Sequence, residues 1–404
     1  MGQTAPALGP PAPASNARAR ANSRPIRVLL QQAALPRYRV PVFRELARRS
    51  GIDLGLVYST SPGLPNAEPD GFRAQHVEYR HVSLGGQEFM WHPGQFRYVS
   101  RRHADAAILS WNTRYLSLIP GLLRARLLGI PVVLWGHGYS KTERALAAWA
   151  RRVVARLARA VVFYNHTAAE AFIAKGFPRE RVFVALNSLD QSPIQASREH
   201  WLARPEELRA FQESKGLAGR KVVLFVSRLD PGNRVSLLLE AADELRARLP
   251  ELLVLVVGKG EEGDALRALV EARRLHDHVR LLGAIYQETE LGAYFASARV
   301  FCYPRNIGLS ILHAFGYALP VVTGDDMSSH NPEIEALRPG ENGLTYRDGD
   351  ASDLARVLER VLTDDALREG LSQGAHRTIT ERFSIEKMVD GFEAAIRYCV
   401  PDRA

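Results

Sequence analysis

One stretch of the chain, residues 299–343, combines residue types and spacing that suit anion binding. An apolar strand is predicted at 299–303, and after a proline-containing turn Gly308 is predicted to open an amphipathic helix at 308–319, followed by a strand at 320–323. The first N–H groups of a helix lack partners within it, and the helix dipole adds roughly half a positive charge there. This pattern favours a phosphate group at the carboxyl edge of a parallel sheet, although a strand–helix–strand unit without a ligand fits the same residues.

Two further strand ends carry side chains suited to ligand binding. Arg228 follows a predicted apolar strand at 221–227, and a guanidinium in that place can bind a phosphate through two parallel hydrogen bonds. His137 lies in a glycine turn after a predicted strand at 131–135. From the residues alone, His137 is placed either to meet a ligand or to serve a structural role.

The predicted strands and helices alternate in two successive sets, which indicates an α/β fold with two Rossmann-like domains that face a central cleft. A chain of 404 residues also suits two domains of common size. We expect a disordered N-terminal lead-in at 1–25, a first domain at 26–190, a linker at 191–218 and a second domain at 219–380. The remaining segment, 381–404, is predicted to be helical.

A set of residues in the stretch described first matches a known motif. The shared positions are Pro304, Gly308, Leu309, Ala314, Pro320, Val321, Val322, Pro332, Glu333, Ile334, Gly340, Asn342 and Gly343. With them the chain resembles the retaining family-4 glycosyltransferases of the GT-B fold. The resemblance spans most of residues 26–398, is strongest at 221–350, and implies that the last helix crosses back onto the first domain.

Two departures from the family pattern fall on the donor site. The family carries two glutamates separated by seven residues, the first touching the donor sugar and the second the nucleotide ribose, and these positions hold Arg305 and His313 here. Arg305 cannot accept a hydrogen bond, whereas a neutral His313 can. We therefore interpret the chain as a divergent, bacterial-type member that lacks these glutamates.

The resemblance implies roles for residues of both domains. His137 matches a histidine near the reacting centre, and Arg228 matches an arginine that neutralises the donor diphosphate, so these two are the predicted catalytic residues. The family's lysine near that arginine is replaced by Asn233, with Arg234 beside it. The predicted donor-binding residues are Arg234, Asn233, Gly258, Arg305, Asn306, Gly308, Leu309, His313 and Glu333.

The loop after the first predicted strand is the expected acceptor side. In the family this loop meets donor and acceptor, often through glycines. It contains no glycine here, but Arg37, Tyr38 and Arg39 offer hydrogen-bond donors. A solvated loop is an equally good interpretation of these three residues.

The resemblance implies transfer of a sugar from a nucleotide diphospho-sugar to a glycan or lipid-linked acceptor, with retention of the anomeric configuration. No metal and no cofactor beyond the donor substrate are expected. Arg228, the helix dipole and the N–H groups of Gly308 and Leu309 would stabilise the leaving diphosphate. Two alternatives remain: a nucleotide-sugar-binding pseudoenzyme or partner protein in glycan assembly, which the donor-site departures favour, and a sugar-nucleotide 2-epimerase, which the linker fits poorly.

Charge is distributed unevenly along the chain. Residues 1–190 contain 26 Lys+Arg and 11 Asp+Glu, a net charge of +15, whereas the remainder has 27 and 33. This asymmetry suggests an anionic partner for the first half. In a predicted helix at 143–160 the arginines share one face, which either meets anionic lipid headgroups or is simply the solvated back of a core helix. No nucleic-acid-binding motif is found, so nucleic acid is not an expected partner.

The sequence also carries hints of location. It has no run of 18 uncharged apolar residues, and the N-terminus has no secretory apolar region. The two cysteines, Cys302 and Cys399, suggest neither a disulfide framework nor a metal site. We expect a cytoplasmic protein, with peripheral attachment to the cytoplasmic membrane face left open.

Overall fold

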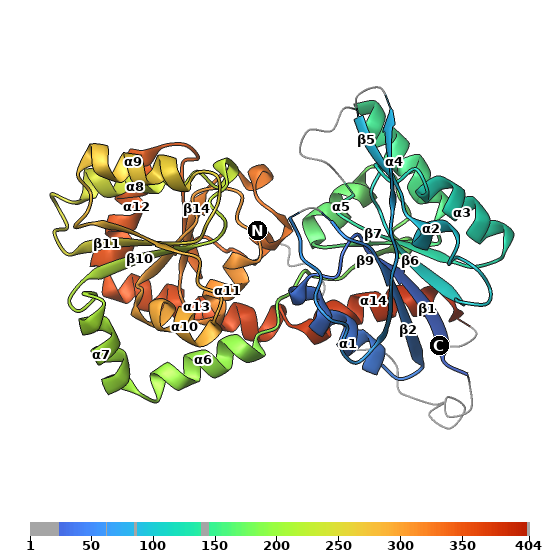
Figure 1. The fold of residues 1–404 in the computed structure, drawn as a ribbon, viewed down its shortest axis with the longest axis horizontal. Coiled ribbons are helices and arrows are strands. Elements are labelled where there is room, and N and C mark those ends of the chain that lie inside the picture. The colour runs from blue at the N-terminus through green and yellow to red at the C-terminus, as the bar shows by residue number, and fades with distance from the viewer. Residues whose placement is uncertain (1–23, 62, 85–86, 139–144, 402–404) are drawn as a thin grey trace, which may run out of the picture.

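The computed structural model describes residues 24–61, 63–84, 87–138 and 145–401. These residues form two α/β domains that lie next to each other (Figure 1). The predicted lead-in at 1–25 falls outside the described residues except for its last two positions. The predicted α/β class with two Rossmann-like domains is confirmed.

The first domain is built on a seven-stranded parallel sheet with the strand order β3-β2-β1-β6-β7-β8-β9. The strands are β1 (Ile26–Gln31), β2 (Ile52–Tyr58), β3 (Arg73–His76), β6 (Ala106–Ser110), β7 (Val132–Trp135), β8 (Ala160–Phe163) and β9 (Val182–Val184). A separate antiparallel pair consists of β4 (Arg80–Leu84) and β5 (Gln87–Trp91). The strand order reverses between β1 and β6, and ligands of such sheets bind at the carboxyl ends at this switch point.

Helices cover both faces of this sheet. They are α1 (Val40–Arg48), α2 (Pro93–Phe96), α3 (Leu118–Leu127), α4 (Ala145–Leu157) and α5 (His166–Ala174). Helix α1 packs on one face through residues such as Phe43, and α3 and α5 pack on the other through residues such as Leu122 and Phe172. In α4, Arg151 is buried while Trp149 is exposed. Part of the arginine face of this helix therefore points inward and part of its apolar face points to solvent, so the two predicted faces are not cleanly separated.

The second domain has a six-stranded parallel sheet with the order β12-β11-β10-β13-β14-β15. The strands are β10 (Lys221–Val226), β11 (Leu252–Val257), β12 (Val279–Gly283), β13 (Val300–Cys302), β14 (Val321–Gly324) and β15 (Gly343–Tyr346). The helices are α8 (Val235–Leu245), α9 (Gly263–Arg273), α10 (Glu288–Ser297), α11 (Ser310–Gly316), α12 (Ala351–Thr363) and α13 (Asp365–Arg382). Its switch point lies between β13, which is buried throughout, and β10, which is buried except at its first and last residues.

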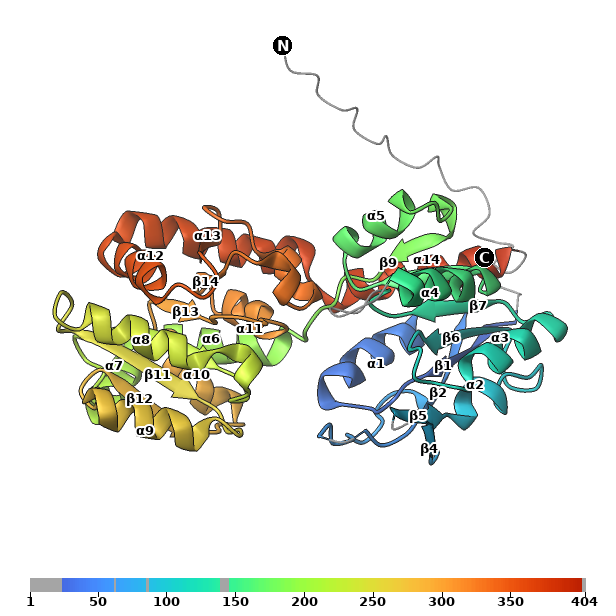
Figure 2. The ribbon, with the colours of Figure 1, turned by 90° about the horizontal axis from the view of Figure 1, so that it is seen from above.

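Two segments join the domains. Helices α6 (Ser192–Leu202) and α7 (Pro205–Ser214) follow the first sheet, and both pack against α10 of the second domain. Helix α14 (Ile385–Cys399) runs from the second domain onto the face of the first sheet that α1 also covers (Figures 1 and 2). There the ring of Phe392 meets the ring of Trp135 edge-on, with centroids 4.7 Å apart. The last helix is thus part of the core of the first domain.

Candidate active site

Arg228 lies at the switch point of the second sheet, two residues after β10 ends. Its side chain is 76% exposed, and its guanidinium lies 3.5 Å from the Asp230 carboxylate. The backbone that carries it is held in place. The Asn233 amide donates to the Arg228 carbonyl oxygen at 2.7 Å, and the Tyr303 hydroxyl donates to Ser227 Oγ at 3.0 Å. An exposed guanidinium on a fixed backbone suits diphosphate binding.

Gly258 is needed to hold this loop. A Cβ on Gly258 would stand 1.8 Å from the Ser227 carbonyl oxygen. We expect Gly258→Ala to lower the free energy of unfolding by about 3 kcal/mol and to weaken binding of a nucleotide, because the strand end before Arg228 must move. Chemical denaturation and calorimetric titration would measure the two effects. Gly263→Ala is the matched control, since its Cβ would meet no atom closer than 3.9 Å; equal losses in both variants would contradict this role.

The turn after β13 is fixed by amide side chains. Asn306 has a left-handed backbone, with φ of 63°, and its Nδ2 donates to Asn233 Oδ1 at 3.2 Å. Asn331 Nδ2 donates to the Asn306 carbonyl oxygen at 2.9 Å. Asn233, predicted to contact the donor, is therefore buried with both ends of its amide used within the protein. It links the Arg228 loop to this turn, and so acts as a positioning residue.

The helix after this turn is shorter than predicted. Helix α11 begins at Ser310 rather than Gly308 and ends at Gly316, because Ala318 takes a left-handed backbone with φ of 57°. In the described part of the chain, the N–H groups of Gly308, Leu309 and Ser310 have no hydrogen-bond acceptor. Ser310 Oγ donates to a carbonyl at the end of β10 at 3.4 Å, so these N–H groups lie near the strand that leads to Arg228.

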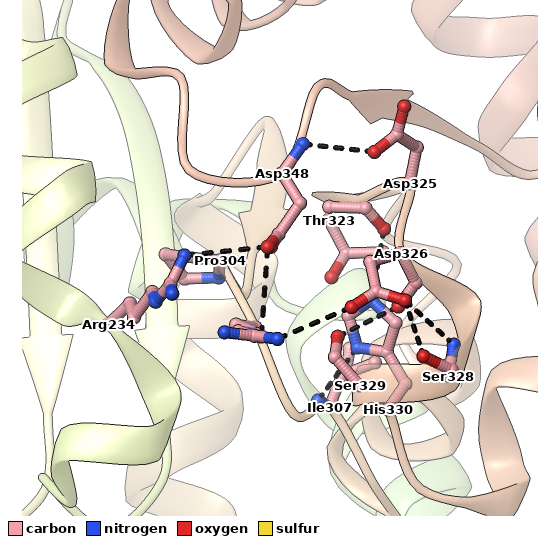
Figure 3. A network of polar contacts seen from close by, with 12 residues as sticks. Arg234, Pro304, Ile307, Thr323, Asp325, Asp326, Ser328, Ser329, His330 and Asp348 are labelled. Carbon is pink, nitrogen blue, oxygen red and sulfur yellow. Dashed lines mark hydrogen bonds and ion pairs between the residues drawn. The ribbon is translucent and has the colours of Figure 1, made fainter.

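Arg305 occupies the place of the family's first glutamate and is bound by carboxylates. Its guanidinium lies 3.3 Å from Asp326 and 3.8 Å from Asp348, and Arg234 reaches the same Asp348 at 3.4 Å (Figure 3). The hydroxyl and N–H of Ser328, together with the charge of Arg305, hold the pKa of Asp326 below its ordinary value. Two aspartates therefore surround the position where the family pattern has a glutamate.

His313, at the second glutamate position, is paired with Glu288 of α10. Its Nε2 is 2.9 Å from the Glu288 carboxylate, which also accepts from the Tyr317 hydroxyl at 2.6 Å. Burial alone would raise the pKa of Glu288, but the hydrogen bonds of His313 and Tyr317 and the charge of His313 lower it overall. Burial and the bond to Glu288 raise the pKa of Tyr317. A ribose would therefore have to meet the other ring nitrogen of His313.

The lowered pKa of Glu288 gives a pH-dependent prediction. A carboxyl whose pKa is lower in the folded than in the unfolded chain stabilises the fold above its ordinary pKa, 4.5 here, and this contribution is lost as pH falls through the folded value. We expect Glu288→Gln to cost about 1 kcal/mol near neutral pH, with the difference from the original protein shrinking below pH 4.5. Urea denaturation across pH would measure it. Glu290→Gln, at an exposed position of the same helix turn, should show no such trend.

A cavity of about 430 Å³ opens at the switch point of the first sheet. His137 lines it at the end of β7, with its ring centroid 4.7 Å from that of Tyr164. Its wall is rich in hydrogen-bonding groups that we did not predict from the sequence. These are Gln32, Ser110, Asn112, Thr113, Arg114, Tyr115 and Arg151. Five of them, Gln32 and residues 112–115, lie in the loops after β1 and β6, so their position after buried strands was the available signal.

A buried polar chain joins the two domains. Arg39 Nη1 donates to Asn187 Oδ1 at 2.8 Å, and Asn187 Nδ2 donates to the Glu333 carboxylate. All three side chains are less than a tenth exposed, and the rings of Trp135 and Tyr164 cover the Arg39 guanidinium. Arg39 was predicted on the acceptor side and Glu333 at the donor. Because both are buried in this junction, we describe them as positioning residues; in the same loop only Arg37 is exposed and Tyr38 half-buried.

The junction brings residues of the two predicted sites near each other. Tyr164, against which the His137 ring lies, is followed by an asparagine that donates to the Pro332 carbonyl oxygen at 3.3 Å. The adjacent Glu333 carboxylate lies 3.6 Å from where a Cβ on Gly308 would stand. Burial raises the pKa of Tyr164 to about 12, so its phenol keeps its proton. The carboxyl edges of the two sheets therefore meet at this point.

The sequence matches two glycosyltransferase family models in succession. Residues 42–192 match the model described as "Glycosyltransferase Family 4", and residues 208–378 match "Glycosyl transferases group 1". The two matches fall on the two domains. Together with the fold and the relatives described next, they show that the chain belongs to the family-4-like glycosyltransferases with the GT-B fold.

Among characterised proteins, the chain is 28% identical over 287 residues to an alpha-D-kanosaminyltransferase of Streptomyces kanamyceticus, covering 66% of this chain and 70% of that protein. It is 30% identical over 178 residues to the lipopolysaccharide core biosynthesis glycosyltransferase LpsE of Rhizobium meliloti, covering 43% and 49%. The second alignment thus spans about half of that relative's length.

Solved structures share the fold. The crystal structure of Anabaena Alr3699/HepE in complex with UDP superposes with a TM-score of 0.69 at 19% identity, covering 91% of this chain and 98% of that chain. At this identity the likeness concerns the fold alone. In the described part of this chain, we find no helix with the length and apolar character needed to cross a membrane.

Proposed function

We propose that the protein transfers a sugar from a nucleotide diphospho-sugar to a glycan or lipid-linked acceptor, with retention of the anomeric configuration. The observation that carries this proposal is the exposed Arg228 guanidinium just after β10, together with the N–H groups of Gly308, Leu309 and Ser310, which have no acceptor among the described residues, in a turn that is hydrogen-bonded to the end of the same strand. A positive charge and convergent N–H donors suit a diphosphate that gains charge as it leaves. A structural relative, Alr3699/HepE, binds UDP in its crystal structure, which supports this assignment.

The reaction needs a stabilised leaving group and a route for one proton. Arg228 and the three N–H groups would stabilise the departing diphosphate, with no metal required. The leaving phosphate would accept the proton of the acceptor hydroxyl, so no protein base is needed. His137 would lie beside the reacting sugar, and Arg234 near the phosphates.

The donor sugar would find carboxylate acceptors despite the loss of the family's glutamates. Arg305 stands in the first glutamate's place, and Asp326 pairs with it while remaining partly exposed, with 37% of its side chain open to solvent. A carboxylate oxygen can accept hydrogen bonds from sugar hydroxyls, which Arg305 cannot. This substitution of one acceptor for another favours an active transferase over a pseudoenzyme.

The acceptor would enter the cavity of the first domain beside His137. Amide, hydroxyl and guanidinium groups line it, including Gln32, Asn112 and Arg114, and such groups bind sugar hydroxyls. A relative named for lipopolysaccharide core biosynthesis supports a glycan or lipid-linked acceptor.

The proposal is tested by measuring nucleotide release from UDP-, GDP- and ADP-sugars, with and without crude lipid or glycan acceptors. Release of nucleotide from one donor, even by slow hydrolysis, is the expected result, and it identifies the nucleotide base of the donor. Binding without release under every condition would favour the pseudoenzyme, and conversion to an epimeric sugar nucleotide would favour the epimerase. Retention is tested by proton NMR of the first sugar anomer released, which should match the anomer of the donor.

A further inference from the structure

Two neighbouring helices of the first domain expose large apolar side chains. On α3, Ile119, Leu123 and Leu127 are 48%, 47% and 88% exposed, and on α4, Trp149 and Val153 are 55% and 38% exposed. Residues four apart in a helix share a face, so each helix presents one row of apolar side chains. Helices α3 and α4 contact each other (Figures 1 and 2). We call these five residues, together with the exposed Leu116 before α3, the apolar stripe.

The stripe gathers most of the exposed large apolar side chains in the described part of the chain. The others are Leu202, Tyr286 and Met327, which are scattered over α6 and the second domain. Single exposed apolar residues are ordinary on protein surfaces, whereas a contiguous set marks an interaction surface. The stripe therefore has the character of an interaction surface, and the chemistry around it indicates the kind of partner.

The surroundings of the stripe are strongly basic. A cavity of about 460 Å³ is lined by residues of both helices and by four arginines, Arg126, Arg156, Arg159 and Arg181. Among the described residues no ion pair with a carboxylate is found for any of the four, although Arg181 donates to the carbonyl oxygens of Ala158 and Arg159. Over residues 106–169 the chain contains nine Lys+Arg and a single acidic residue, Glu143. The partner of the stripe must accordingly combine an apolar layer with negative charge.

We propose that the apolar stripe docks on the surface of an anionic lipid bilayer, with the exposed Arg126, Arg156 and Arg159 facing the headgroup phosphates. Helices that lie on membranes insert their apolar side chains below the headgroups while basic residues meet anionic lipids. A second copy of the chain is a poorer partner, because pairing two such faces would bring two sets of arginines together. The stripe adds the apolar side chains of α3 and α4 to the basic charge from which the sequence suggested an anionic partner.

The position of the stripe suits delivery of a lipid-linked acceptor, an extension that rests on the proposed function. Leu116 directly follows Tyr115, which lines the cavity beside His137, and Arg151 of α4 lines the same cavity. An acceptor held in the bilayer by its lipid would thus reach the cavity from the docked face. Docking itself does not depend on the transfer reaction.

Sedimentation of the full chain with vesicles tests docking. Vesicles of phosphatidylcholine with phosphatidylglycerol are compared with phosphatidylcholine alone, and binding to the anionic vesicles is expected to be stronger and to weaken with salt. We expect Arg126→Gln with Arg156→Gln to reduce partitioning roughly 30-fold, about fivefold for each charge. Leu123→Gln with Leu127→Gln should reduce it on the order of tenfold or more.

Leu202→Gln is the matched control, since Leu202 is exposed but lies on α6, and it should bind vesicles like the original protein. Circular dichroism melting establishes that each variant folds, and the two double variants test the surface independently. Wild-type protein that ignores anionic vesicles, or stripe variants that bind as well as the control, would overturn the proposal. If light scattering instead shows that the wild-type protein is a dimer and that the stripe variants are monomers, the surface would be assigned to a second copy of the chain. Nucleotide release from a water-soluble donor is measured alongside, so failure of docking and failure of the transferase proposal are distinguished.

Discussion

Replacing Arg228 with alanine is expected to reduce donor turnover by roughly two to three orders of magnitude, or about 3 kcal/mol of barrier. The physical reason is that its exposed guanidinium is the charge presented at the second switch point, on a backbone held by Asn233 and Tyr303. The leaving diphosphate gains charge in the transition state, so the loss should appear in kcat as well as in donor affinity. Steady-state kinetics of nucleotide release with the donor found in the panel would measure both.

Arg267→Ala is the matched control for that variant. Arg267 is an arginine of the same domain, similarly exposed and paired with a nearby aspartate, but it lies on α9. It should leave donor kinetics unchanged. Unchanged kinetics in Arg228→Ala as well would remove the diphosphate assignment, and an equal loss in both variants would point to a general effect of surface charge.

Replacing Glu333 with alanine is expected to destabilise the protein by about 3 kcal/mol. The variant removes the carboxylate that the Asn187 amide binds, and so breaks the buried chain that links Glu333 through Asn187 to the Arg39 guanidinium. Arg39 belongs to the first domain, Asn187 to the segment between β9 and α6, and Glu333 to the second domain. The lost stability should therefore come from the contact between the two domains. Equilibrium denaturation in urea, followed by tryptophan fluorescence, would measure the change.

Glu335→Ala provides the comparison. Glu335 lies two residues away and accepts hydrogen bonds from Thr167 of the first domain at 2.9 and 3.1 Å, but it is only half-buried. Its removal should cost no more than about 1 kcal/mol. Equal costs for the two variants would mean that the buried chain contributes no more than an exposed contact.

Much of the fold follows from the sequence for a simple reason. Strands buried on both faces of a parallel sheet read as short continuous apolar runs, and Ile26–Gln31, Ile52–Tyr58 and Ala106–Ser110 have the predicted bounds. The helix predicted at 308–319 proved too long at both ends. Its apolar spacing continues past Gly316, and the left-handed backbone at Ala318 that ends it occurs at an alanine, which carries no turn signal.

The candidate site was less predictable because its residues meet across long sequence distances. The sequence indicated which strand ends carry Arg228 and His137. It did not indicate which neighbouring polar groups are already hydrogen-bonded to other residues of the protein. Asn233 and Arg39 have donor groups that suit a ligand, yet both are buried in contacts with distant residues. Likewise, the pairing of Arg305 with Asp326 depends on a loop that follows the next strand.

Hydrogen–deuterium exchange with and without the nucleotide that the donor panel identifies would show whether the donor binds at the switch point of the second sheet. We predict slower exchange in peptides that cover 227–234 and 303–310, where Arg228 and the free N–H groups lie, with little change on α9. The protection should disappear in Arg228→Ala. Protection confined to the first-domain segments around Gln32, Asn112 and His137, with none at 303–310, would mean that the nucleotide does not bind at the second sheet.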